Sequence, residues 1–182
     1  MDEDKRLYQE FLNGNQTAFD KIMDKHAARL IYFIFGFVKK YDVAEDLAQD
    51  VFVYLLLNKE KYNFSCALKT YLYLIARSRA INYLKSNVSR REIPIADYQG
   101  QEEIFEIEEK VFDNIRDQNI RDAISNLKPK DKQIMYLAKI EEMKIKEIAQ
   151  VLNMTESNVK VSIHRGMKRL KKILGEEDDL YV

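Results

Sequence analysis

Glycine and proline are scarce in this chain. Together they supply seven of its 182 residues, well below the roughly 12% of ordinary proteins. A β-rich fold with many tight turns is therefore disfavoured. Hydrophobic residues make up 46% of the sequence and charged residues 33%, a mixture that suits helices with one buried and one solvated face. We expect an all-α fold.

Cysteine and long apolar runs are also rare. The single cysteine, Cys66, cannot form an intrachain disulfide, and the N-terminus lacks the apolar stretch of a signal peptide. The longest apolar run, residues 30–38, is shorter than the roughly 20 residues that a membrane-spanning helix requires. The sequence predicts a soluble, cytoplasmic protein.

The chain has no net charge, because 30 basic residues balance 30 acidic ones. That balance argues weakly against nucleic-acid binding, which usually needs a basic excess. The charge is segregated, however: residues 69–91 carry +6, residues 97–122 carry −6 and residues 156–174 carry +5. We predict two small helical domains, an N-terminal helical bundle over residues 1–89 and a C-terminal helix-turn-helix domain over 119–182, joined by an acidic linker over 90–118.

Four helices are predicted in the N-terminal domain. The first two cover residues 4–12 and 17–40, and residues 30–38 are apolar nearly all round, which predicts a buried centre. The third begins at Asp42, with Glu45 at capping-box spacing, and the fourth covers residues 67–85. On the third helix, helical spacing predicts an inward face of Val43, Leu47, Val51, Tyr54 and Leu55.

The most specific local pattern is a helix-turn-helix over residues 144–159. Such a motif needs a small residue where the helices cross, a residue tolerant of left-handed geometry in the turn, and an apolar anchor on the second helix. Ala149, Asn153 and Val159 supply them at the right spacing, and Thr155 is placed to cap the second helix.

The second helix of this motif has three predicted faces. Val159, Ile163, Leu170 and Leu174 should face the core, and another side carries Ser157, Lys160, Val161, His164, Lys168 and Lys171. A third stripe holds Asn158, Ser162, Arg165, Arg169 and Lys172. We interpret it as a recognition helix for the DNA major groove. A helical hairpin with a solvated basic face is the alternative.

The fourth helix carries a second candidate surface. Tyr71, Ser78, Asn82 and Lys85 fall in one narrow stripe. An aromatic ring beside amide, hydroxyl and ammonium groups is typical of proteins that bind single-stranded nucleic acid. An ordinary amphipathic surface would have the same pattern.

The third helix presents carboxylates: Asp42, Glu45, Asp46, Gln49 and Asp50 share its polar side. A solvated face or a protein-docking surface explains them better than acid–base or metal chemistry. The two histidines, His26 and His164, belong to no catalytic or metal-binding motif, and no glycine-rich phosphate loop occurs. We therefore predict a binding protein that is not an enzyme and holds no metal or cofactor.

In this combination the sequence resembles bacterial sigma factors of the extracytoplasmic-function type. Residues 44–52 resemble the helix that docks on core RNA polymerase, residues 71–84 the helix that engages the minus-ten element during melting, and residues 122–174 the module that reads the minus-thirty-five element. The resemblance implies a factor that binds core RNA polymerase and directs promoter recognition, melting and transcription initiation.

The resemblance also implies roles for individual residues. Polymerase docking falls to Asp46, Gln49 and Asp50. The minus-ten strand would be held by a base-receiving loop and the fourth helix, through Asn63, Phe64, Ser65, Tyr71, Arg77, Ser78, Asn82 and Lys85. The minus-thirty-five duplex would face Ser157, Asn158, Lys160, His164, Arg165 and Lys168. The linker would follow the RNA path of the polymerase, and an anti-sigma factor would be the regulator.

The sequence departs from the family pattern at several positions. Tyr71 stands where tryptophan is frequent, Ser78 where asparagine is frequent, Asn82 where aspartate is frequent and Asn153 where glycine is common. Two other hypotheses stay open. One is a stand-alone helix-turn-helix regulator whose N-terminal domain senses a ligand or dimerises, and the other is a metal-dependent hydrolase acting through Glu45, Asp46 and Asp50.

Overall fold

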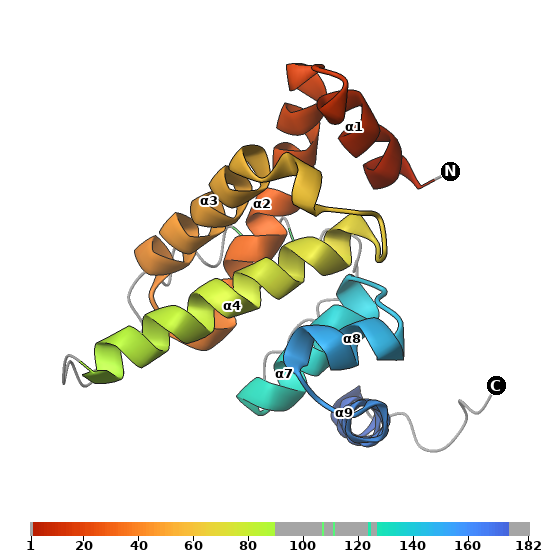
Figure 1. The fold of residues 1–182 in the computed structure, drawn as a ribbon. Helices are drawn as coiled ribbons and strands as arrows, with labels where there is room; N and C mark the ends of the chain where they lie inside the picture. Colours follow the sequence, from red (N-terminus) through yellow and green to blue (C-terminus); the bar gives the residue numbers. More distant parts are fainter. Residues whose placement is uncertain (1, 90–106, 108–110, 112–123, 125–126, 175–182) are drawn as a thin grey trace. The chain divides into compact units, whose positions relative to one another are not determined.

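The computed structural model describes residues 2–89, 107, 111, 124 and 127–174 (Figure 1). Every regular element in these residues is helical, as the sequence predicts. The chain divides into two compact units, residues 1–110 and 111–182. The predicted linker, residues 90–118, lies almost wholly outside the described residues. Within the described parts, no helix is both long and apolar enough to cross a membrane.

Unit 1 is a bundle of four α-helices. They are α1 (Glu3–Leu12), α2 (Gln16–Val38), α3 (Tyr41–Leu57) and α4 (Leu68–Ser89), and a short 3₁₀ turn, η1 (Lys59–Lys61), follows α3. Helix α2 contacts the other three α-helices (Figure 1). Its residues Leu30, Phe33 and Ile34 are fully buried. The predicted buried centre of this domain is therefore confirmed.

Helix α1 is attached to α2 by a charged cluster. The buried Asp4 carboxylate lies 2.9 Å from His26 Nε2 and 2.6 Å from Lys25 Nζ. Burial by itself would raise the pKa of Asp4, but the hydrogen bonds and positive charges of His26 and Lys25 outweigh it and lower that pKa to about 2. The turn between the helices places Gly14 at φ +94°, a conformation in which glycine is unstrained.

The start and the inward face of α3 differ from the prediction. The helix begins at Tyr41, and its N-cap is Lys40, which makes no side-chain cap hydrogen bond, so the capping box at Asp42 and Glu45 is wrong. The buried side chains are Ala44, Ala48, Val51, Phe52 and Leu55, whereas Val43, Leu47 and Tyr54 are only half-buried. Small alanine side chains let α3 approach the bundle closely, and the larger Val43 and Leu47 lie at the edge of that contact.

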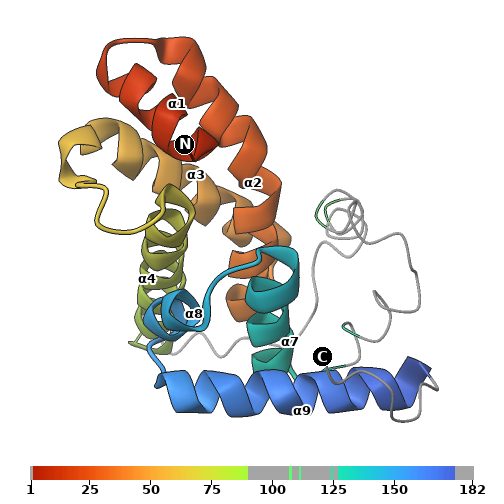
Figure 2. The same cartoon turned by 90° about the vertical axis from the view of Figure 1, so that its right-hand side faces the viewer.

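Unit 2 contains α7 (Pro129–Met135), a π-helical turn η2 (Tyr136–Ile140), α8 (Ile145–Leu152) and α9 (Glu156–Leu174). Helices α7 and α8 both lie against α9 (Figure 2). Gly166 sits where α9 meets α7: a Cβ atom there would lie 2.6 Å from the Sδ atom of the buried Met135. A Cβ atom at position 166 would therefore require the Met135 side chain to move.

Candidate nucleic-acid interfaces

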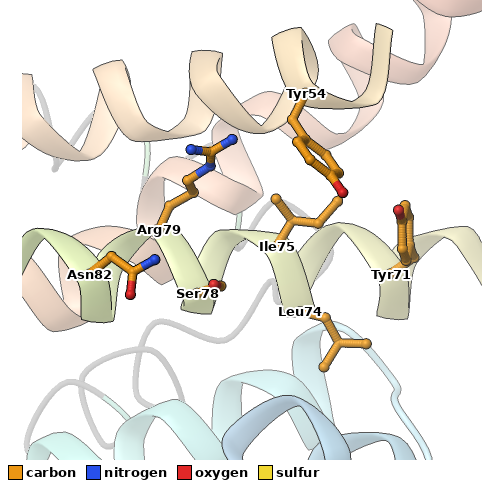
Figure 3. A pocket seen from close by; sticks show the side chains of 7 residues that line it. All are labelled: Tyr54, Tyr71, Leu74, Ile75, Ser78, Arg79 and Asn82. Atoms are coloured by element: carbon orange, nitrogen blue, oxygen red, sulfur yellow. The ribbon is translucent and has the colours of Figure 1, made fainter. Parts of the chain in front are cut away.

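A pocket of about 420 Å³ opens between α3 and α4 (Figure 3). Three residues of the predicted single-strand stripe, Tyr71, Ser78 and Asn82, line it. The other lining residues are Tyr54, Leu74, Ile75 and Arg79. Arg77, which is half-buried, and Lys85, which is exposed, are not among the lining residues. The structure thus brings most of the predicted stripe into one concave site.

Four lining residues lie outside the predicted stripe, and two of them, Tyr54 and Arg79, bring an aromatic ring and a positive charge to the pocket. Tyr54 extends from α3 toward α4, and Arg79 points from α4 toward α3 (Figure 3). The Arg79 guanidinium carbon lies 5.5 Å from the centroid of the Tyr54 ring, within cation–π distance. Burial and the neighbouring Tyr54 raise the pKa of Tyr71. The pocket thus combines two aromatic rings and a guanidinium with hydroxyl and amide groups.

The loop that contains Asn63, Phe64 and Ser65 is supported by a cluster of aromatic rings. Tyr62 is buried, and its ring centroid lies 4.8 Å from that of Phe64 and 5.1 Å from that of Tyr71. Its hydroxyl donates a hydrogen bond to the Cys66 carbonyl oxygen at 2.7 Å. The cluster therefore links the loop to the α3–α4 pocket.

The backbone of this loop has an uncommon conformation. Phe64 has φ +59°, which is rare for a residue with a bulky side chain. The Ser65 backbone N–H donates to Asn63 Oδ1 at 3.1 Å, and both of these residues are exposed. A strained loop conformation held by its surroundings is a common property of functional sites.

The polar side of α3 is open to solvent. Asp46, Gln49 and Asp50 are all exposed, and Val53 and Leu57 continue the same face with 52% and 76% of their surface accessible. Among the described residues there is no cluster of histidine, cysteine, aspartate and glutamate that could hold a metal ion. This face is suited to contact with another macromolecule.

The predicted turn of the helix-turn-helix has the expected geometry. Asn153 adopts the left-handed conformation, with φ 53° and ψ 54°. The Thr155 hydroxyl accepts a hydrogen bond from the Asn158 backbone N–H at 3.2 Å and so caps α9. Ala149 and Val159 are buried between the helices. The motif prediction is confirmed at each of these positions.

All six residues predicted to face the minus-thirty-five element are exposed on α9: Ser157, Asn158, Lys160, His164, Arg165 and Lys168. Two other assignments on this helix are wrong. Ser162, predicted on an outer stripe, is 2% exposed, and Ile163, predicted in the core, is only half-buried. The side chain of Leu174 lies outside the described residues.

Ser162 belongs to a polar network that connects α9 with α7. Asp131 Oδ2 accepts a hydrogen bond from Arg169 Nη1 at 2.8 Å, and Asp131 Oδ1 lies 4.0 Å from Arg165 Nη2. Arg165 Nη2 also donates to Ser162 Oγ at 3.2 Å. Because Ser162 has this polar neighbour, its hydroxyl is accommodated in a buried position.

Comparison with known proteins identifies the two units. Residues 22–90 match Sigma-70 region 2, and residues 117–170 match Sigma-70, region 4. The chain belongs to the sigma-70 family. Within that family it is of the extracytoplasmic-function type, in agreement with the resemblance. Because region 2 covers most of α2 and all of α3 and α4, a ligand-sensing domain in that place no longer has support.

The relatives of this sigma factor are distant but match over most of their length. RNA polymerase sigma factor YlaC of Bacillus subtilis is 24% identical over 160 residues, which cover 87% of this chain and 92% of the relative. ECF RNA polymerase sigma factor SigW of the same organism is 25% identical over 180 residues, with 93% and 96% coverage. As a sigma factor, the chain acts in promoter recognition and transcription initiation by RNA polymerase.

Two solved structures share the fold. The sigma factor RpoE of Bartonella quintana, solved in complex with the anti-sigma factor NepR, is 18% identical with a TM-score of 0.59, and the match covers 88% of this chain and 98% of that one. CnrH, solved with the cytosolic domain of CnrY, is 19% identical with a TM-score of 0.58, covering 97% of this chain and 100% of that one.

Proposed function

We propose that this sigma factor engages its promoter through two separate surfaces, one for unwound DNA on unit 1 and one for duplex DNA on unit 2. The functional domains would be residues 1–89 and 119–182, with residues 90–118 as the linker. The observation that carries the proposal is the α3–α4 pocket, because Tyr71, Ser78 and Asn82 line it together with Arg79.

The pocket and the adjacent loop would hold the unpaired minus-ten strand. Stacking of a base on an aromatic side chain contributes about 1–3 kcal/mol, and the Tyr71 ring is the candidate platform. Arg77 and Lys85 belong to the same helix without lining the pocket, and they would contact phosphates. Flipping a base out of the stack costs a few kcal/mol, so the loop of Asn63, Phe64 and Ser65 would have to provide compensating contacts.

Helix α9 would lie in the major groove of the minus-thirty-five element. Ser157 and Asn158 are in its first turn and would approach base edges, as in other helix-turn-helix proteins. Lys160, His164, Arg165 and Lys168 continue the exposed side and would contact phosphates or bases. This assignment is supported by the exposure of all six side chains and by the capped start of the helix.

The remaining surfaces would bind proteins. We assign Asp46, Gln49 and Asp50 to docking on core RNA polymerase, because they form an exposed polar face on α3. Of the two similar solved structures, the sigma factor RpoE is in complex with the anti-sigma factor NepR, and CnrH is in complex with the cytosolic domain of CnrY. An anti-sigma factor is accordingly proposed as the regulator here. The chain would act in the cytoplasm with the polymerase, contribute no catalytic residue of its own and require no cofactor.

The test is transcription by reconstituted holoenzyme. The full chain should co-purify with core polymerase and support run-off transcription from genomic fragments. Failure to associate with core, combined with sequence-specific duplex binding by the chain alone, would overturn the proposal.

The pocket itself is tested with forked promoter DNA. Tyr71→Ala should weaken binding of this DNA by holoenzyme about tenfold, the equivalent of one lost base stack. Tyr83→Ala is the matched control, because Tyr83 is a half-buried tyrosine of α4 that does not line the pocket. Equal losses in the two variants would contradict the assignment of Tyr71.

A further inference from the structure

One apolar side chain is exposed on the basic side of α9. Val161 has 55% of its surface accessible, and among the described residues of unit 2 it is the only large hydrophobic side chain that is exposed. Local structure gains nothing from it, because valine is a weaker helix former than alanine, lysine or arginine. An exposed valine in the middle of a helix therefore calls for an explanation outside the fold.

Val161 lies at the centre of the surface assigned to duplex DNA. Residues three or four positions apart are neighbours on a helix surface. Ser157 and Asn158 precede Val161 by four and three positions, and His164 and Arg165 follow it by three and four. All four of these side chains are exposed, so they surround the valine. A duplex that they contact would also cover Val161.

The helix holds Val161 in a fixed position. Val159 and Ser162 are 0% and 2% exposed, so this turn of α9 is anchored in the core of unit 2. A valine side chain in a helix also has one strongly preferred χ1 rotamer. Contact with a ligand would therefore cost little side-chain entropy, and the two methyl groups would be presented in a defined direction.

We propose that Val161 contacts the C5 methyl group of a thymine in the minus-thirty-five element and so selects that base. The inference rests on the proposed function of α9 and adds a residue and the chemical group that it recognises. Valine has no polar atom in its side chain, so it cannot bind phosphates or the polar edges of bases. The thymine methyl is the apolar group that base pairs present in the major groove.

The experiment replaces each thymine of the minus-thirty-five element by deoxyuridine, one at a time and on either strand. Deoxyuridine lacks only the methyl group and pairs with adenine in the same way. Holoenzymes with the wild-type chain and with Val161→Ala are compared on a promoter recovered by run-off transcription. For each protein, the affinity for the thymine DNA is divided by the affinity for the uracil DNA. Val161→Ala should keep the fold, because the position is exposed and alanine favours the helix.

At one thymine, the wild-type ratio should be about three, the effect of burying one additional methyl group. In Val161→Ala the ratio at the same thymine should fall to about one, and the other thymines should give equal ratios with both proteins. The inference is overturned if the element holds no thymine on either strand, if no uracil substitution weakens wild-type binding, or if the ratios of the two proteins agree at every position.

Val53→Ala is the matched control. Among the described residues, Val53 is the other valine with more than half of its surface exposed, and it lies on α3 in unit 1. Its ratios should equal those of the wild type at every thymine, because an effect on polymerase binding would weaken both DNAs equally and cancel. A fall of the ratio in this variant as well would overturn the contact at Val161.

The proposed function of α9 is read separately with Lys160→Ala. If that variant leaves promoter affinity and its salt dependence unchanged, the assignment of α9 to duplex DNA fails. If Lys160→Ala weakens binding and the uracil ratios of Val161→Ala equal those of the wild type, only the role of Val161 is refuted.

Discussion

Replacing Gly166 with alanine should destabilise unit 2, although alanine is the better helix former. The added Cβ would lie 2.6 Å from Met135 Sδ and 2.8 Å from Met135 Cγ. Met135 is completely buried, so its side chain cannot move into solvent. Overpacking of this kind costs about 1–3 kcal/mol, whereas exchanging glycine for alanine inside a helix gains at most about 1 kcal/mol. We expect a net loss of about 1 kcal/mol.

Urea unfolding of the full chain, followed by circular dichroism, measures this loss. A double-mutant cycle with Met135→Ala tests its cause. Met135→Ala alone leaves a cavity and should cost about 2–5 kcal/mol. In the Gly166→Ala background it should cost at least about 1 kcal/mol less, because the new methyl group occupies part of that cavity.

Gly14→Ala is the matched control. It also adds a methyl group to a glycine, but Gly14 has φ +94° and no neighbour within 4 Å of the added atom. Its cost should therefore arise from backbone strain and should not change when Met135 is shortened. The reasoning is refuted if Gly166→Ala stabilises the chain, or if the effects of Gly166→Ala and Met135→Ala simply add.

Three further predictions concern the other surfaces. Asp4→Asn should lower the free energy of unfolding by about 2 kcal/mol at pH 7, because the pKa of Asp4 falls from its usual 3.8 to about 2 on folding. This stabilisation is present above pH 3.8 and lost as the pH falls through 2, so the stability of the variant in urea melts should vary less over that window. A variant with the same pH profile as the wild type would show that ionised Asp4 does not stabilise the fold. Asp46→Ala should weaken core polymerase binding in a pull-down titration and leave the melting temperature unchanged; a parallel loss of stability would make Asp46 structural. Lys160→Ala should lower promoter affinity by about 1 kcal/mol and the salt slope by about 1, and an unchanged slope would remove Lys160 from the interface.

The helix-turn-helix was predictable from sequence because its determinants are local. Asn153 tolerates the left-handed turn, and Thr155 caps a helix that begins at the next residue. Both effects act over only a few residues, so spacing alone identifies them. The central position of α2 was predictable for a similar reason, since a segment that is apolar all round has to be buried.

The α3–α4 pocket was only half predictable. Tyr71, Ser78 and Asn82 share a helical stripe, but Tyr54 comes from another helix and joins them only because α3 packs beside α4. The inward face of α3 was predicted correctly at Val51 and Leu55 but not at Val43 and Leu47, because hydrophobicity ranks valine and leucine above alanine. At a close helix contact, size decides instead, and Ala44 and Ala48 are the residues that fit.

The cluster that joins α1 to α2 also has a consequence for the order of folding during synthesis. Asp4 meets Lys25 and His26 across only 21 and 22 residues, whereas Tyr8 donates its hydroxyl hydrogen to the Lys59 carbonyl oxygen, 51 residues away, at 2.7 Å. Closing the shorter loop costs less entropy, and a nascent chain presents its N-terminus first. The α1–α2 hairpin would therefore be complete while the residues after Lys59 are still inside the ribosome, so the loop around Phe64 would assemble on a surface that has already folded.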